Sequence, residues 1–231
     1  MQNDFIIMLA WPELMVRNPN SWYDWFFDQN GKYTFNKIFG KKITTRYRGG
    51  HSALILVNAK NNKLHYFDNG RYHTPFGFGR IRDAETDPDV GISFKAEIED
   101  GEIKNIEDIL IDAAKKKANH GEGTLYASVL YNIDFNLAFL YAKKIQNKDA
   151  IKYGPFVFNG TNCSRFTCSV AINSNPNLLK KIRLMFPCTV MPSPKRNISI
   201  CNKNFYVVKN DICKKINRNI ISGYFKSIER Q

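Results

Sequence analysis

A cysteine at the start of a predicted helix is the residue of this chain whose position best suits chemistry. Cys163 lies in the stretch NGTNCSRFTCSV, where a polar loop leads into an amphipathic run that Thr161 or Asn162 can cap. The positive end of a helix and a neighbouring histidine both lower the pKa of a thiol and make it a nucleophile. The alternative is a small core residue, the usual role of a free cysteine. One face of the predicted helix carries positions at helical spacing: Cys163, Phe166, Thr167 and Val170.

His51 is the histidine best placed to act as a base. In GGHSALILV it is the first residue of a very apolar predicted strand, and the two preceding glycines allow another segment or a ligand to come close. Its alternative is a strand-end histidine with no role in chemistry. His120, in KKKANHGEG, is expected to be a polar residue at a helix end.

A third polar group is expected on the strand that follows His51. The stretch HSALILVNAKNNKLHYFD has two β-prone runs around a polar turn, which predicts a β-hairpin. With the turn centred on residues 60–61, the region of Tyr66 to Asp68 comes opposite His51. Asp68 can accept a hydrogen bond from the imidazole and select its tautomer. Because a slip of one residue exchanges the two faces of a strand, Tyr66 and His65 remain alternatives.

The segment RYHTPFGFGRIRDAETDPDVG is predicted to be a loop of about twenty residues, a length that is typical of functional loops. Its arginines could bind carboxylate or phosphate groups and its phenylalanines could form apolar walls of a substrate site. The alternative is a loop held together by pairs such as Arg82 with Asp83 or Asp87. The candidate substrate-binding residues are Arg71, Phe76, Phe78, Arg80 and Arg82.

Hydrophobic periodicity and turn residues predict the remaining elements. Strands are expected over residues 5–11, broken by Pro12, and over 92–101, 124–134 and 203–210. Helices are expected over residues 105–120, 135–149, 163–173 and 175–187, with a short aromatic helix or turn at 20–33 and a last helix around 211–228.

Composition and charge indicate a globular protein with a basic surface. Hydrophobic residues make up 43% and charged residues 24% of the 231 residues, so disorder is not expected for most of the chain. The net charge of +13 has a local part, since residues 195–231 carry nine basic residues against two acidic ones. The basic residues are scattered, which favours a solvated surface; nucleic-acid binding is kept as the less favoured partner hypothesis.

The sequence favours a reduced, cytoplasmic location. The start of the chain lacks the basic residues and uninterrupted apolar run of a signal peptide, and no window is apolar enough to span a membrane. Five cysteines, an odd number in a chain of this size, favour free thiols. Cys163 and Cys168 point to different sides of a helix and no Cys-x-x-Cys occurs, so neither a zinc site nor another metal or cofactor is predicted.

Three short motifs together resemble the circularly permuted papain-like superfamily. GHSALIL, LHYFD and NCSRF place a histidine at a strand start, a polar residue on the returning strand and a cysteine at a helix start. This order, His51 before Cys163, is that of the permuted group, which includes lecithin retinol acyltransferase-like proteins and relatives of bacterial cell-wall endopeptidases. The resemblance covers residues 48–173. It implies a nucleophile at Cys163, a base at His51, an orienting group at Asp68 and an antiparallel sheet packed against the cysteine-bearing helix.

The resulting hypothesis is an α+β protein with a permuted papain-like core, an antiparallel sheet packed against helices. A catalytic domain is expected over residues 1–190, and a basic carboxy-terminal extension, 191–231, is expected to pack on it. The predicted function is a cysteine hydrolase that cleaves an amide, peptide or ester bond in a small-molecule or peptide substrate, without a cofactor. The alternatives are a non-catalytic module of the same fold that grips an anion or nucleic acid, and an acyltransferase. The sequence indicates neither the substrate nor the oligomeric state.

Overall fold

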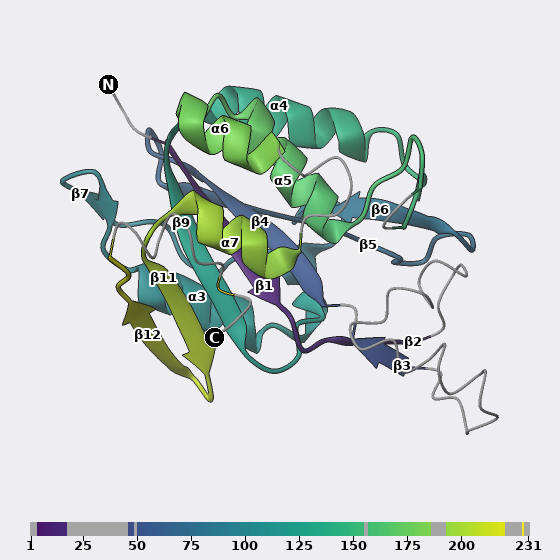
Figure 1. The fold of residues 1–231 in the computed structure, drawn as a ribbon, viewed down its shortest axis with the longest axis horizontal. Helices are drawn as coiled ribbons and strands as arrows, with labels where there is room; N and C mark the ends of the chain where they lie inside the picture. The colour runs from purple at the N-terminus through teal and green to yellow at the C-terminus, as the bar shows by residue number, and fades with distance from the viewer. Residues whose placement is uncertain are drawn as a thin grey trace.

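The protein is organised around an eight-stranded sheet in which every neighbouring pair of strands is antiparallel (Figure 1). The computed structural model describes residues 4–17, 46–48, 50–154, 157–185, 193–219 and 228. The order across the sheet is β10-β6-β5-β4-β1-β9-β11-β12. Its strands are β1 (Asp4–Trp11), β4 (His51–Asn58), β5 (Lys63–Gly70), β6 (Phe78–Arg82), β9 (Leu125–Ile133), β10 (Ile151–Lys152), β11 (Phe205–Lys209) and β12 (Ile212–Ile216).

Helices cover both faces of this sheet, which confirms the predicted α+β class. On one face, α4 (Phe135–Gln146), α5 (Cys163–Asn173), α6 (Leu178–Met185) and α7 (Pro194–Cys201) pack on a core that includes Leu54 and Phe67. On the other, α3 (Ile106–Lys115) packs on a second core that includes Ile55 and Tyr66 (Figure 1). Two small sheets pair β2 (Met15–Arg17) with β3 (Arg46–Arg48) and β7 (Ile98–Glu99) with β8 (Glu102–Ile103).

The central strands are apolar on both faces because both faces are covered. Residues 5–11 of β1 and 51–57 of β4 are all buried, so neither strand alternates between polar and apolar residues. The two strands pair antiparallel, with Trp11 opposite His51. β4 and β5 form the predicted hairpin with its turn centred on residues 60–61, and Ala53 lies opposite Asp68. Asp68 is therefore on the same face as His51, two positions along the ladder rather than directly opposite it.

Most of the other predicted elements are confirmed, but two predictions upstream of α3 are wrong. The predicted loop over residues 71–91 contains β6, whose residues 80–82 pair with 68–70 of β5. The predicted strand over residues 92–101 is reduced to β7, since only Ile98 and Glu99 find a partner strand. The predicted helix or turn at residues 20–33 lies outside the described residues.

The predicted last helix, around residues 211–228, is also wrong at its start, because residues 212–216 form β12, and residues 220–227 lie outside the described residues. This strand pairs antiparallel with β11, and the two residues between them, Asn210 and Asp211, have φ angles of 51° and 62°. A two-residue connection with positive φ at both positions is the turn that joins tightly paired strands, and Asn and Asp tolerate this conformation better than most residues do.

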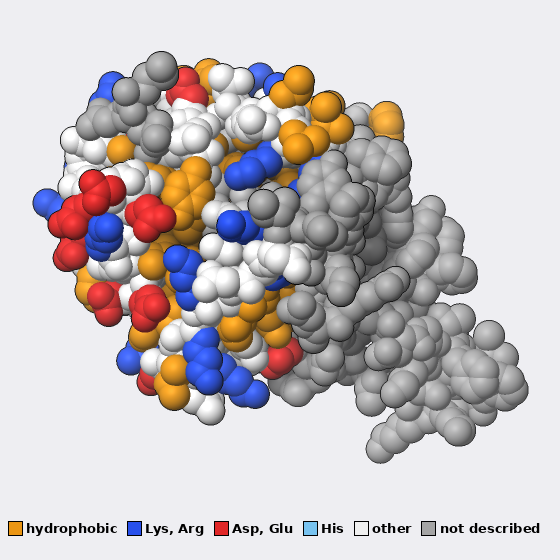
Figure 2. All heavy atoms as spheres, turned by 60° about the vertical axis from the view of Figure 1, so that its left-hand side comes forward, with side chains coloured by type: hydrophobic (Ala, Val, Ile, Leu, Met, Phe, Trp, Pro, Cys, Tyr) orange, Lys and Arg blue, Asp and Glu red, His pale blue; other side chains and the backbone are white. Residues whose placement is uncertain are grey.

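The carboxy-terminal segment contributes to the main sheet and its cover. β11 pairs with β9, and α7 packs against β9 and β1. Whether residue 190 marks a domain boundary remains a prediction. On the face drawn in Figure 2, Lys and Arg side chains are distributed among apolar and acidic ones rather than gathered in one patch. Among the described residues, no helix has the length and apolar character needed to cross a bilayer.

The turn between β11 and β12 generates a prediction about stability. Replacing Asp211 by Gly should stabilise the protein by about 0.5–1 kcal/mol, because glycine adopts positive φ without a steric penalty. The ion pair that is lost, Asp211 with Lys115 at 3.4 Å, joins two exposed side chains and contributes little. Thermal denaturation measures the change. Asp211→Ala is the matched control, which loses the same ion pair but should lower the melting temperature; an equal change in both variants would contradict the prediction.

Candidate active site

The thiol of Cys163 lies at the first residue of α5, as predicted. The side chain of Asn162, one of the two predicted caps, accepts a hydrogen bond from the backbone N–H of Arg165 at 2.8 Å, which starts the helix. The other candidate, Thr161, lies in an isolated bridge with Tyr153. The helix packs on the β4 and β5 hairpin, and Cys163 is buried at 7% exposure. The site is thus a buried thiol at the amino end of a helix, where the dipole favours a thiolate.

His51 lies beside both other members of the predicted triad. Its Nε2 lies 3.3 Å from Oδ2 of Asp68, and Cys163 is near enough to raise the pKa of the imidazole. Because Nε2 faces Asp68, Nδ1 is the nitrogen left for the thiol. Gly50 precedes the strand with φ of 65°, and a Cβ there would lie 3.4 Å from the backbone of Pro12. The close approach expected beside His51 is therefore made by the chain itself.

Trp11 holds the imidazole from the neighbouring strand, a contact that sequence reasoning missed. The two rings are stacked, with centroids 5.8 Å apart and planes inclined by 23°. The pairing of Trp11 with His51 across β1 and β4 places the rings together. The indole in turn packs against Gly121, where a Cβ would come within 2.3 Å of it. A tryptophan just before Pro12, at the end of an apolar strand, was the available signal.

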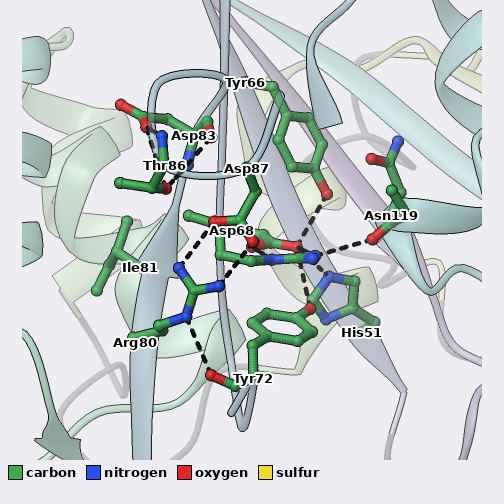
Figure 3. A network of polar contacts seen from close by, with 12 residues as sticks. His51, Tyr66, Asp68, Tyr72, Arg80, Ile81, Asp83, Thr86, Asp87 and Asn119 are labelled. Atoms are coloured by element: carbon green, nitrogen blue, oxygen red, sulfur yellow. Dashed lines mark hydrogen bonds and ion pairs between the residues drawn. The ribbon is translucent and has the colours of Figure 1, made fainter. Parts of the chain in front are cut away.

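Asp68 is the centre of a buried polar network (Figure 3). Its side chain has no exposure to solvent, and Oδ2 accepts hydrogen bonds from the hydroxyls of Tyr66 at 3.1 Å and Tyr72 at 3.0 Å. Arg82 donates to both oxygens, from Nε to Oδ1 at 3.0 Å and from Nη2 to Oδ2 at 2.6 Å. A buried carboxylate needs such partners, since an unpaired one would be neutralised by a proton.

The network keeps Asp68 and His51 in their charged forms. Burial alone would raise the pKa of Asp68, but the hydrogen bonds and positive charges of His51 and Arg82 lower it to about 2. Burial alone would lower the pKa of His51, but hydrogen bonds to Asp68 and Cys163 and the negative charges of both raise it to about 9. An imidazolium flanked by two anionic groups is the arrangement that stabilises a thiolate.

The pKa of the Cys163 thiol is lowered as a result. Burial would raise this pKa, but the hydrogen bond to His51 and its charge, together with hydrogen bonds to Tyr153 and Ser164, outweigh burial. Tyr153 is a second residue that sequence reasoning missed. Its hydroxyl accepts a hydrogen bond from the backbone N–H of Cys163 at 3.4 Å, and burial beside the Cys163 thiol raises its own pKa well above the ordinary value. The hydroxyl therefore stays protonated at neutral pH and can donate.

The position of Tyr153 depends on a glycine of β6. Tyr153 follows β10, which pairs with β6, and its backbone N–H donates to the carbonyl of Gly77 at 2.8 Å. A Cβ at Gly79 would lie 2.5 Å from the Tyr153 ring and 2.8 Å from the carbonyl oxygen of Gly70. Only a residue without a side chain leaves room for the ring at this point.

The predicted substrate-binding residues lie in different surroundings. Both terminal nitrogens of Arg80 donate to Asp87, at 2.7 and 2.6 Å, and Arg82 donates to Asp68. Both guanidinium groups are therefore bound to carboxylates of the same chain. The other predicted pairs of Arg82, with Asp83 or Asp87, are not among the ion pairs of the described residues. Phe76 is 76% exposed and Phe78 is partly buried in β6. Arg71 is partly buried, and its charge acts on Tyr153 beside the thiol.

The other residues considered as site members are placed elsewhere. His65 packs against Phe135 and Phe139, on the α4 side of the sheet, and burial lowers its pKa. Tyr66 lies beside Asp68 and donates to it. The Cys168 thiol donates to the carbonyl of Leu184 in the core, as its core assignment predicts.

His120 lies at the edge of the network around Asp68. Its ring stacks on Tyr72, with ring centroids 5.2 Å apart. Within the part of the chain that the structure describes, no three His, Cys, Asp or Glu side chains are arranged to hold a metal ion.

Comparisons with known proteins place the chain in a family. A solved structure, that of the Type VI secretion system effector TseH, is similar with a TM-score of 0.62 and 18% sequence identity, over 93% of this chain and 98% of that chain. At this identity the likeness supports the fold alone. No curated protein matches the sequence. The family model described as Type VI secretion system effector TseH-like matches residues 6–179, which is well over half of the sequence. The chain therefore belongs to the TseH-like family of Type VI secretion system effectors.

Proposed function

We propose that the protein is a cysteine hydrolase with a permuted papain-like core, which cleaves an amide, peptide or ester bond. Cys163 is the nucleophile, His51 the base and Asp68 the group that orients His51. The observation that carries the proposal is one buried imidazole that lies 3.3 Å from the Asp68 carboxylate and whose charge lowers the pKa of the Cys163 thiol. Nucleophile, base and orienting group within hydrogen-bond reach are the signature of nucleophilic catalysis.

The first half of the reaction would form a thioester. The Cys163 thiolate attacks the carbonyl carbon of the substrate, and the carbonyl oxygen becomes an oxyanion. The backbone N–H of Cys163 donates to the hydroxyl of Tyr153 before substrate binds; the oxyanion would replace this contact and accept a hydrogen bond from each group. The His51 imidazolium then gives its proton to the leaving amine or alcohol as the bond to the carbonyl carbon breaks.

The second half would release the acyl group. Neutral His51 removes a proton from a water molecule, which attacks the thioester carbon, and the Cys163 sulfur leaves as a thiolate stabilised by the imidazolium. Water as the acceptor yields a carboxylic acid and makes the protein a hydrolase. An amine or alcohol in the same place would make it an acyltransferase, which remains the alternative outcome of the same chemistry.

Family membership suggests the setting of this activity. Since the family is that of TseH-like Type VI secretion system effectors, we propose that the hydrolysis is the activity that the protein exerts as an effector. We also propose that the substrate is a small molecule or a peptide. The cytoplasmic location that the sequence favours is likewise a proposal.

A binding module with an inert site is the competing function. It would bind an anion through the arginines that follow β5, but the guanidinium groups of Arg80 and Arg82, both in β6, already bind Asp87 and Asp68. This engagement of the two arginines favours the enzyme.

The reactivity of the thiol tests the proposal directly. Alkylation of Cys163 by iodoacetamide should stay fast below pH 7, because the imidazolium lowers the pKa of this thiol and keeps it ionised. His51→Ala removes that charge, so the reaction at pH 6 should slow by about tenfold or more. Mass spectrometry of the labelled peptide follows the rate. Cys168→Ala is the matched control and should leave it unchanged, whereas a thiol that is inert in the unmodified protein would sink the proposal.

Tyr153→Phe tests the second donor to the oxyanion. Removing the hydroxyl leaves the ring in place but takes away a donor to the thiolate and to the developing oxyanion. Turnover of an ester or peptide substrate should fall about 10²-fold, and the midpoint of alkylation against pH should move up.

Tyr131→Phe is the control for Tyr153→Phe. Tyr131 is a partly buried residue of β9, packed on Phe5, and does not belong to the site. This variant should change neither quantity. Full turnover in Tyr153→Phe would assign oxyanion stabilisation to the backbone alone.

A further inference from the structure

Arg82 is held within the protein on several sides. Its two bonds to Asp68 form a fork, and the same Nη2 donates to the carbonyl oxygen of Ala118 at 3.0 Å. The central carbon of the guanidinium lies 3.4 Å from the centroid of the Tyr72 ring. The side chain has 5% exposure. A guanidinium engaged in this way is poorly placed to bind a ligand from solvent, which was its predicted role.

We propose that Arg82 is a positioning residue for the Cys163 and His51 pair, which acts through Asp68 by fixing the carboxylate and cancelling its charge. The proposal rests on the proposed function for its catalytic meaning. It reassigns Arg82 from substrate binding to control of the base.

The first argument is geometric. Oδ2 of Asp68 is shared by four donors, and the contact from His51, at 3.3 Å, is longer than those from Tyr66, Tyr72 and Arg82. The His51 contact alone would hold the carboxylate weakly. The fork of Arg82 binds both oxygens and so fixes the carboxylate plane, which a single donor cannot do. The direction in which His51 finds its acceptor thus depends on Arg82.

The second argument is the balance of charge. Arg82, Asp68, His51 and Cys163 form a chain of buried groups whose charges alternate when the thiolate and imidazolium are present, and they sum to zero. When the proton returns to sulfur, the remaining pair of Arg82 and Asp68 also sums to zero. With Arg82 present, both protonation states of the site are therefore neutral overall. Without Arg82 both states would carry an unbalanced carboxylate, which is costly in a buried site.

The other titratable groups around His51 do not supply this balance. Tyr66 of β5 and Tyr72 after β5 are both protonated at neutral pH, because burial raises the pKa of each well above its ordinary value. Tyr153, beside α5, is protonated for the same reason. Burial lowers the pKa of His120, in the loop after α3, which favours its neutral form. None of these four groups is positively charged at neutral pH, so the charge that offsets Asp68 comes from Arg82.

The titration of His51 tests the inference without any substrate. All proteins carry Cys163→Ala, so that the thiol does not titrate with the imidazole, and carbon-13-labelled histidines are followed by NMR against pH. His51→Gln assigns the signal. Arg82→Met should raise the pKa of His51 by about 1 pH unit, the size expected for loss of a unit charge a few ångströms away at partial screening. Arg82→Lys keeps the charge and should restore the titration to within about 0.3 pH unit.

Control variants keep the test decisive. Arg80→Met removes the neighbouring fork, to Asp87, and should leave the His51 titration unchanged. Arg82→Gln removes the charge but keeps an amide donor for Asp68, so it should show the same rise if Arg82→Met fails to fold. An unchanged or lowered pKa of His51 in Arg82→Gln, or an equal shift in Arg80→Met, would overturn the inference.

The inference and the proposed function can fail separately. An inert Cys163 thiol in the alkylation experiment removes the nucleophile but leaves the effect of Arg82 on His51 intact. If the pKa of His51 is the same with and without Arg82, the positioning role is wrong, but the reactivity of the Cys163 thiol is unaffected.

Discussion

The burial of the Asp68 carboxylate is the constraint on which the site depends. A charge without solvent must be surrounded by donors, and here they come from β4, β5, β6 and the loop after β5. Each donor is thereby fixed in place: His51 toward the thiol, Tyr72 between Arg82 and His120, and Arg82 against Ala118. Removal of one partner from such a pair typically costs about 3–5 kcal/mol, so the network orders the site and the surrounding fold together.

The two groups that we propose to react, His51 and Cys163, come from opposite sides of the sheet. His51 follows the face of β4 that belongs to the α3 core, as Ala53 and Ile55 do, whereas α5 packs through Phe166 on the other core. They can meet because each is the first residue of its element, at an end of the sheet where neither core intervenes. Placing chemistry at element ends leaves both cores free for apolar packing.

The parts of the site that follow from local patterns were predictable from the sequence. Asn162 and Cys163 form a cap and a helix start, and HSALILV with LHYFD forms a hairpin whose register follows from its turn. Two other residues of the site were harder to predict, because Arg82, which binds Asp68, and Tyr153, which contacts Cys163, are brought there by strand pairings that no local pattern indicates. Likewise β12 follows from a two-residue turn, Asn210 and Asp211, whose signal is weaker without a glycine.

The main error of sequence reasoning, a loop in place of β6, has a functional reason. Glycine, proline and aspartate residues across 71–91 led to the prediction of a loop, and Gly79 is the residue of β6 that belongs to this pattern. Yet Gly79 is the residue that leaves room for Tyr153 beside the thiol, and Arg82 is the one that holds Asp68 beneath the base. One short strand thus serves both His51 and Cys163, and the glycine that this requires is a residue that weakens its signature as a strand.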